Sequence, residues 1–264
     1  MFSQPESVQD NMPRHVLREL GFAVRSAGDG LIGEAPVTPH AHVPGTSHLR
    51  TSVLAAWADM LAGLLAMRAF EPGVPVTVEL DVHLYAPAPA AGVILGTSRT
   101  VKAGRSVFVA AIDFTDGDGR PVALAGGSFM AAPDRTLRAP SATSIDEPAP
   151  AVLLSVPLAE RAGCTRAEPG VAVLPRSDDG LNASRTVNGG LIALAAEEAV
   201  LSLAPGGTLS SLGLRYLQPA RVGPVVASAR IRDGLASAEL RDAGNGDRLC
   251  VTATARTWPT RAEK

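Results

Sequence analysis

A single carboxylate stands in the middle of a long apolar stretch of the sequence. From Leu49 to Arg68 nearly every side chain is apolar or small, and Asp59 is the only charged side chain between Arg50 and Arg68. The stretch predicts a helix that is apolar all round, which other structure must enclose. Burial disfavours the charged form of a carboxyl group, so Asp59 is a candidate general base or nucleophile.

A second apolar stretch carries both an acid and a candidate anion-binding site. It runs from Gly190 to Ala204, contains Glu197, and directly follows Asn188 and Gly189. The first N–H groups of a helix have no partner within the helix and carry partial positive charge. Glycine at such a position allows a carbonyl oxygen to approach the N–H closely. The start of this helix could therefore hold an oxyanion.

Composition limits the classes of protein and of partner. The chain has 264 residues and a formal charge of −2, and it is 46% hydrophobic and 19% charged. These values are typical of a packed globular protein with room for one large domain or two of roughly 130 residues. No basic cluster favours nucleic acid as a partner. The two cysteines, Cys164 and Cys250, predict buried thiols rather than a disulfide framework.

The N-terminal residues lack the basic and then apolar order of a signal peptide. We also expect the apolar stretch around Asp59 to be too short to cross a bilayer, which needs ~20 residues. Together these points predict a cytoplasmic protein with no membrane partner.

Other motifs that could carry chemistry are incomplete. His40, His42 and His48 lie in a Pro-rich loop without a nearby acidic or cysteine ligand, so we expect no metal site. No helix follows the Gly-rich hairpin sequence 117–120, which argues against a dinucleotide loop. The sequence contains no Gly-x-Ser-x-Gly elbow of an α/β serine hydrolase. We therefore expect no resident cofactor.

The order of elements occurs twice in the chain. The segment 80–87, Leu-Asp-Val-His-Leu-Tyr-Ala-Pro, matches 212–219, Leu-Gly-Leu-Arg-Tyr-Leu-Gln-Pro, and each follows one of the two apolar stretches. A duplication of this size must be explained before any single motif is interpreted. We predict an N-terminal domain over residues 14–131, a linker rich in Pro, Ala and Ser over 132–156, and a C-terminal domain over 157–260.

In the N-terminal half, the patterns predict a short amphipathic helix from Pro13 to Gly21. Strands are expected over residues 22–25, 31–37, 75–85, 92–102, 106–115 and 121–130. The predicted fold class is α+β, with two curved antiparallel sheets that each wrap around one long apolar helix. Edge-to-edge pairing of the two units would join their sheets and make the chain its own pseudo-twofold dimer. The alternative is two independent α+β domains.

The stretch 182–190, Asn-Ala-Ser-Arg-Thr-Val-Asn-Gly-Gly, followed by Glu197, resembles the hotdog fold and more narrowly the PaaI-like acyl-CoA thioesterases. That family has an Asn, a Gly-Thr pair and a His-Gly-Gly helix start, and then an Asp or Glu within the helix. Asn182 and Glu197 fall at the family's Asn and carboxylate. Asn188 replaces its His, and Arg185 replaces its Gly before Thr. The resemblance covers about residues 15–131 and 157–258 and implies a double hotdog.

The resemblance also implies how the residues divide between two sites. In hotdog dimers, one subunit offers the carboxylate and a Ser or Thr that assists water, and the other offers the Asn and the helix-start Gly. Carried over to the two halves, the first site consists of Asp59, Thr77, Asn182, Asn188 and Gly189.

The second site would be incomplete. It combines Glu197 with Leu49, Arg50 and Thr51 at the start of the first helix, and these supply neither Asn nor Gly. Leu209 takes the place that Thr77 has in the first site. We therefore predict one working site per chain, built between the two halves.

Each of these residues also has a purely structural interpretation. Asp59 could lie on an exposed helix face, and Glu197 could belong to a solvated acidic pair at a helix end. Gly189 could serve only close helix packing. Asn182 could be a turn or cap residue, and Thr77 a simple strand former.

The function that the resemblance implies is hydrolysis of an acyl-CoA thioester, with Asp59 as base on water or as nucleophile that forms an anhydride. Arg99, Lys102 and Arg105 cluster around a strand turn and could contact the CoA phosphates, or could be solvated surface charge. The implied partners are a small-molecule acyl-CoA and a second copy of the chain in a homodimer. The alternatives are a non-catalytic acyl-CoA or lipid-binding protein, and a hotdog hydratase or dehydratase.

Overall fold

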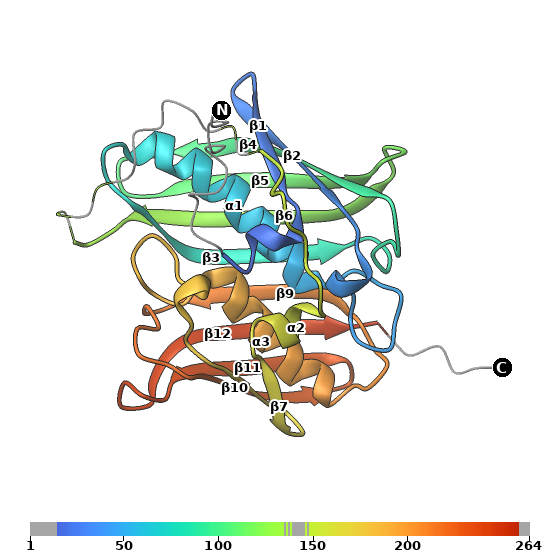
Figure 1. The fold of residues 1–264 in the computed structure, drawn as a ribbon. Helices are drawn as coiled ribbons and strands as arrows, with labels where there is room; N and C mark the ends of the chain where they lie inside the picture. The colour runs from blue at the N-terminus through green and yellow to red at the C-terminus, as the bar shows by residue number, and fades with distance from the viewer. Residues whose placement is uncertain (1–14, 135, 137, 139–145, 147, 259–264) are drawn as a thin grey trace, which may run out of the picture.

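The strands of the chain form one continuous antiparallel sheet (Figure 1). The computed structural model describes residues 15–258 except 135, 137, 139–145 and 147. The N-terminal half contributes β1 (Ala23–Ala27), β2 (Gly30–Pro36), β3 (Pro75–Leu84), β4 (Val93–Ala103), β5 (Phe108–Asp116) and β6 (Pro121–Ala131). The C-terminal half contributes β7 (Thr165–Glu168), β8 (Val171–Leu174), β9 (Leu209–Tyr216), β10 (Val225–Arg232), β11 (Leu235–Asp242) and β12 (Arg248–Thr257).

The two halves repeat the same topology. The 12-stranded sheet has the order β1-β2-β4-β5-β6-β3-β9-β12-β11-β10-β8-β7, so each half reads identically from its outer edge to the centre. A long helix follows the second strand of each half. At the centre β3 pairs antiparallel with β9, with Asp81 opposite Gly213. The two sheets that the sequence predicts are joined by this edge-to-edge pairing into one sheet.

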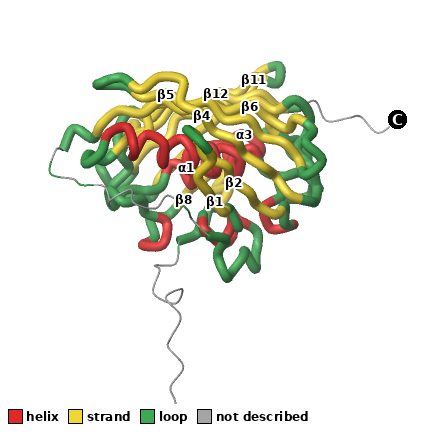
Figure 2. The backbone as a smooth tube through the Cα atoms, turned by 90° about the horizontal axis from the view of Figure 1, so that it is seen from above, coloured by secondary structure: helices red, strands yellow, loops and turns green. Residues whose placement is uncertain are grey.

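The helices α1 (Thr51–Phe70) and α3 (Gly189–Ser202) lie side by side on one face of the sheet (Figure 2). They run in opposite directions, because the start of α3 meets the middle of α1 and the middle of α3 meets the start of α1. They pack closely at Gly190, where an added Cβ would lie 2.7 Å from the Cβ of Ala56. A third helix, α2 (Leu158–Arg161), is a single short turn.

By length and composition α1 could cross a membrane, so the expectation that this stretch is too short is wrong. More than half of it is buried inside the fold, as in the core helix of a globular protein. Its residues have no preferred polar face, which is why the sheet, α3 and the loops surround it.

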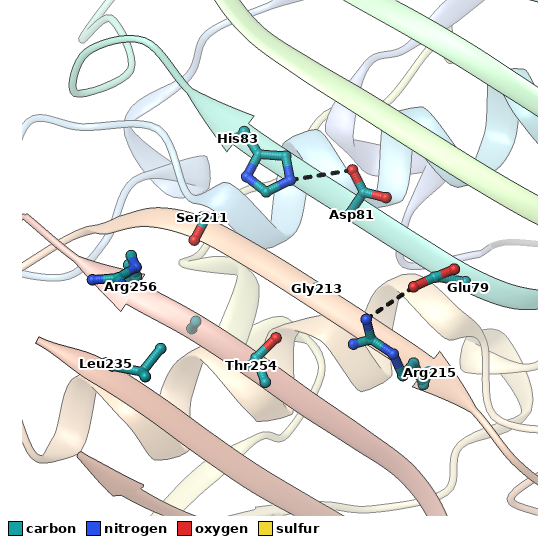
Figure 3. A pocket seen from close by; sticks show the side chains of 10 residues that line it. Glu79, Asp81, His83, Ser211, Gly213, Arg215, Leu235, Thr254 and Arg256 are labelled. Atoms are coloured by element: carbon teal, nitrogen blue, oxygen red, sulfur yellow. Dashed lines mark ion pairs between the residues drawn. The ribbon is translucent and has the colours of Figure 1, made fainter. Parts of the chain in front are cut away.

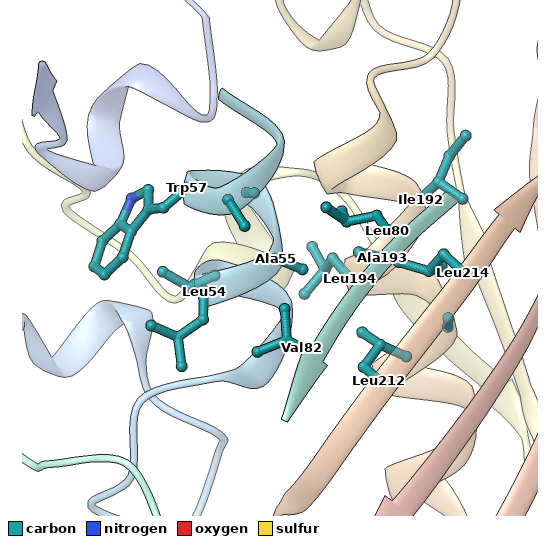
Figure 4. Close-up of a cluster of buried hydrophobic side chains, with 14 of the residues drawn as sticks. Leu54, Ala55, Trp57, Leu80, Val82, Ile192, Ala193, Leu194, Leu212 and Leu214 are labelled. Atoms are coloured by element: carbon teal, nitrogen blue, oxygen red, sulfur yellow. The ribbon is translucent and has the colours of Figure 1, made fainter. Parts of the chain in front are cut away.

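The core is continuous across the central strands (Figure 4). The inner-face residues Leu80 of β3 and Leu212 of β9 are fully buried, and so is Leu194 of α3. Phe22 stacks on Trp57 of α1 with ring centroids 5.1 Å apart. Because both halves bury their apolar residues in the same core, two independent domains are excluded.

The sequence-based boundaries hold within a few residues, with one exception. The helix expected from Pro13 to Gly21 is only a 3-10 turn, η2 (Arg18–Leu20), that ends where Gly21 adopts φ 82°. The predicted domain limits at residues 14 and 260 and part of the predicted linker lie outside the described residues. The prediction of buried free thiols at Cys164 and Cys250 is confirmed.

The close approach of the helices gives a first prediction. Gly190→Ala should destabilise the fold by about 1–3 kcal/mol, because a methyl group there would overlap Ala56 and Leu17. The matched variant Gly63→Ala adds the same methyl within α1, where the nearest atom is 3.7 Å away on Phe129. It should be neutral or stabilise by up to about 1 kcal/mol through helix propensity. Urea unfolding of both variants measures the difference, and equal effects would contradict this packing.

Candidate active site

Asp59 and Thr77 form a hydrogen-bonded pair in the N-terminal half. Asp59 lies in the middle of α1, and Thr77 lies on the face of β3 that contacts this helix. The hydroxyl Oγ1 of Thr77 donates to Oδ1 of Asp59 over 2.8 Å. Both residues are half-buried. The bond occupies one carboxylate oxygen of Asp59 and leaves Oδ2 for another partner.

The environment of Asp59 makes its carboxyl group a weaker acid than an ordinary aspartic acid. Burial disfavours the charged form and raises the pKa of Asp59 to about 6, although the Thr77 hydrogen bond opposes this shift. A carboxyl group with such a pKa is ionised at neutral pH and is still basic enough to accept a proton.

The start of α3 in the C-terminal half faces this carboxylate. A Cβ placed on Gly189 would lie 3.4 Å from Oδ2 of Asp59. Gly189 is the first residue of α3, so its N–H has no carbonyl within the helix, and it hydrogen-bonds to none of the residues that the structure describes. The structure therefore brings Asp59, Thr77 and Gly189 together across the interface of the halves.

The two asparagines have local structural contacts. Oδ1 of Asn188 accepts from Gly190 N–H over 2.8 Å and so caps α3. Oδ1 of Asn182 accepts from the N–H groups of Ser184 and Thr186, at 3.0 and 3.1 Å, and from the Thr186 hydroxyl. This is the turn interpretation of Asn182, and no hydrogen bond joins it to the described Asp59. Asn182 therefore shapes the loop that leads to the helix start.

The same loop contains Arg185, which replaces a family glycine. Its φ of 57° is in the left-handed region that glycine adopts without strain. Arg185 adopts this conformation at some energetic cost, because a side chain disfavours it.

In the second copy of the site, the carboxylate of Glu197 occupies the start of the opposite helix, α1. Oε1 of Glu197 accepts from the N–H groups of Thr51 and Ser52 at the start of α1, over 2.9 and 3.3 Å. Oε2 accepts from the Ser52 hydroxyl over 2.6 Å and pairs with Arg50 at 3.1 Å. The N–H of Thr51 corresponds to that of Gly189, so the anion-binding position is already filled.

The acidic pair at Glu197 and Glu198 is buried, so the interpretation of a solvated pair is wrong. The guanidinium of Arg50 is fully buried and pairs with both carboxylates, and Arg166 pairs with Glu198 at 2.6 Å. This network ties the start of α1 to α3 and β7. It is a structural cluster, since charges buried in this way must be compensated.

The basic residues expected to contact CoA are not gathered at Asp59. Arg99 is in register with Ala111, Gly126 and Asp81, and Lys102 is in register with Glu79 through β5 and β6. Residues in such register share one face of a sheet, and this is the face away from the helices. The sheet therefore separates Arg99 and Lys102 from Asp59. Arg105 is exposed in the turn between β4 and β5.

A groove of about 300 Å³ lies on that outer face across the β3–β9 junction (Figure 3). Within it, Arg215 pairs with Glu79 at 3.0 Å, and Nε2 of His83 lies 3.4 Å from Oδ2 of Asp81. The sheet separates it from Asp59, so it is distinct from the candidate active site.

The sequence interpretation missed Tyr216, which reaches the site from the end of β9. Its hydroxyl donates to the carbonyl oxygen of Gly189 over 3.0 Å. Its repeat counterpart is Leu84, as the alignment of 80–87 with 212–219 gives. An aromatic hydroxyl on the inner face, where the other copy has an aliphatic side chain, was the signal that could have identified it.

Comparison with known proteins places the fold. A family model with the description "Thioesterase superfamily" matches residues 48–123. This segment includes α1, Asp59 and Thr77. None of the curated proteins matches the chain.

Solved structures match over nearly the whole chain. An acyl-ACP thioesterase from Bacteroides thetaiotaomicron is 16% identical with a TM-score of 0.62, and the match covers 86% of this chain and 97% of that one. The 12:0-ACP thioesterase from Umbellularia californica is 10% identical with a TM-score of 0.62, covering 87% and 94%. A hot dog fold protein of unknown function from Alicyclobacillus acidocaldarius is 14% identical with a TM-score of 0.57, covering 95% and 100%. The chain therefore has the hotdog fold.

The raised pKa of Asp59 predicts a pH-dependent stability. As the pH rises from about 4 to about 6, the unfolded chain loses the Asp59 proton before the folded one, so the free energy of unfolding falls. Asp59→Asn has no carboxyl group to ionise, so its free energy of unfolding does not fall in this way. It should be more stable than the wild type by on the order of 2 kcal/mol at pH 8, but not at pH 3.5. Urea unfolding at both pH values measures it.

The control is Asp113→Asn, which removes an exposed carboxylate on the outer face of β5. Its stability difference from the wild type should be the same at both pH values. A pH-independent effect of Asp59→Asn would show that Asp59 ionises normally.

Proposed function

We propose that this protein is a double hotdog thioesterase that hydrolyses acyl-CoA. One observation carries the proposal: Oδ2 of Asp59, a carboxylate with a pKa of about 6, lies beside Gly189 at the start of α3, and the N–H of Gly189 hydrogen-bonds to none of the described residues. A base next to an oxyanion-binding N–H is the pair that acyl transfer to water requires. The thioesterase superfamily match over residues 48–123 supports the same reaction class.

In the reaction, the thioester carbonyl oxygen accepts a hydrogen bond from the Gly189 N–H. Asp59 takes a proton from water, the hydroxide adds to the carbonyl carbon, and the helix start stabilises the oxyanion. Collapse of this intermediate breaks the carbon–sulfur bond, and the CoA thiolate takes up the proton. Thr77 holds Oδ1 of Asp59 so that Oδ2 faces the substrate. The alternative attack by Asp59 itself, through an anhydride, uses the same geometry.

Each chain has one working site in this proposal. The position equivalent to Gly189 N–H is the Thr51 N–H, which Glu197 already occupies. The side chain equivalent to Thr77 is Leu209, which is fully buried and has no hydroxyl. The second copy therefore lacks both a free oxyanion donor and the strand hydroxyl that Thr77 supplies in the first copy.

Two variants test the proposal on a panel of thioester substrates. Release of free thiol should fall at least about a hundredfold in Asp59→Asn, because the base is lost. In contrast, Glu197→Gln should keep wild-type activity per folded molecule, although it loosens the Arg50 network. Asp113→Asn is the control for a lost surface carboxylate. Acyl-ACP substrates belong in the panel because two of the similar structures are named acyl-ACP thioesterases.

The outcomes separate the alternatives. If Asp59→Asn were fully active while Glu197→Gln was inactive, the assignment of the working site would be wrong. If the wild type bound acyl-CoA and hydrolysed none of the panel, the protein would be a binding protein.

The pH profile provides a further prediction. The value of kcat/KM should fall about tenfold per pH unit below pH ~6, as Asp59 becomes protonated. Thr77→Val removes the hydrogen bond that lowers the pKa of Asp59, so it should move this acid limb to higher pH. An acid limb that stays in place in Thr77→Val would contradict the role of Asp59 as the titrating base.

A further inference from the structure

Tyr216 reaches Gly189 next to Asp59. A Cβ placed on Gly189 would lie 3.1 Å from the Tyr216 hydroxyl and 3.4 Å from Oδ2 of Asp59. The space beside Gly189 is thus bordered by one hydroxyl and one carboxylate oxygen. Like Asp59 and Gly189, Tyr216 is half-buried.

The hydroxyl of Tyr216 acts on the first complete peptide of α3. It donates to the carbonyl oxygen of Gly189, and the N–H of the same peptide, from Gly190, donates to Oδ1 of Asn188. This peptide is therefore held at both ends by side chains. A carbonyl oxygen has two lone pairs, so the Tyr216 bond is compatible with the helical bond of that carbonyl.

Gly189 joins two peptides at the start of α3. Its N–H belongs to the peptide with Asn188, whose carbonyl oxygen accepts from the N–H groups of Leu191 and Ile192 over 3.1 Å each. Its carbonyl belongs to the peptide with Gly190, and glycine, which lacks a side chain, allows the widest rotation between the two peptides. An oxyanion donor is effective only when its direction is set before the reaction.

We propose that Tyr216 is a positioning residue, whose hydroxyl fixes Gly189 through its carbonyl oxygen so that the Gly189 N–H is directed at the thioester carbonyl. This inference rests on the proposed function for its consequence in catalysis, and on the hydrogen bond for the positioning itself. The side chain contributes an oriented dipole, and it transfers no proton.

The surroundings keep the hydroxyl protonated. Burial and the nearby charge of Asp59 raise the pKa of Tyr216 well above its usual value. Tyr216 therefore remains a hydrogen-bond donor throughout the pH range in which Asp59 titrates.

The closed second copy lacks this device. The residue equivalent to Tyr216 is Leu84, and the residue equivalent to Gly189 is Thr51. There Glu197 and the Ser52 hydroxyl hold the helix start instead. The tyrosine thus occurs only in the copy whose first helical N–H is free.

The test compares Tyr216→Phe with Tyr85→Phe, which removes the only other tyrosine hydroxyl of the chain from an exposed site. Thiol release from the best acyl-CoA of the panel gives kcat and KM. Tyr216→Phe should lower kcat roughly tenfold, leave KM within about twofold, and leave the acid limb near pH 6 unchanged. Tyr85→Phe should match the wild type.

A second readout does not depend on activity. Amide hydrogen exchange of Gly190, followed by NMR on protein labelled with ¹⁵N-glycine, reports the peptide that Tyr216 and Asn188 hold. Exchange should be several-fold faster in Tyr216→Phe and unchanged in Tyr85→Phe.

Several outcomes would overturn the proposal. Unchanged Gly190 exchange would show that Tyr216 does not hold the peptide. Faster exchange with wild-type kcat would show that the hold has no effect on the reaction. A shifted acid limb would show that Tyr216 acts on Asp59 directly. If the wild type hydrolyses no thioester, the proposed function fails, and the exchange result alone supports or overturns the positioning of Gly189.

Discussion

The pairing of β3 with β9 is the constraint on which the rest of the structure depends. It joins the two halves into one sheet, and the register with Asp81 opposite Gly213 sets their relative position. Because each half carries its helix on the same face, this register also places α1 against α3. The antiparallel contact then brings the acid in the middle of each helix to the start of the other. Neither half contains a complete site by itself.

Within this symmetric frame, the carboxylates Asp59 and Glu197 differ by one methylene group and by their surroundings. Asp59 is held by Thr77 on the sheet and stops short of the α3 start, so the Gly189 N–H remains free. Glu197 is longer and finds Leu209 where the other copy has Thr77. It therefore binds the α1 start directly and neutralises the partial charge of the helix end. The buried Arg50 compensates the remaining charge.

The two faces of the sheet have different chemistry because side chains alternate along each strand. Thr77, Leu80, Leu212 and Tyr216 face the helices and build the core and the site. Glu79, Asp81, His83 and Arg215 face outward, where they pair with one another along the β3–β9 junction. A basic residue on a strand can therefore be separated from Asp59 by the whole sheet. Arg99 and Lys102 are two examples.

The sequence by itself determined the repeated order of elements, the strand limits, the two enclosed helices and the lone acid at Asp59. These features depend on local periodicity and composition, which each segment carries with it. The sequence also placed Thr77 and Gly189 in one site, through resemblance to a family. Only the tertiary structure decided that Glu197 is buried against Arg50, that Asn182 serves a turn, that Arg99 faces outward, and that Tyr216 reaches Gly189. The Asn182 turn is local, because its partners are Ser184 and Thr186. The other three depend on contacts between residues far apart in the chain, and such contacts are fixed by the pairing of the strands and the packing of α1 on α3.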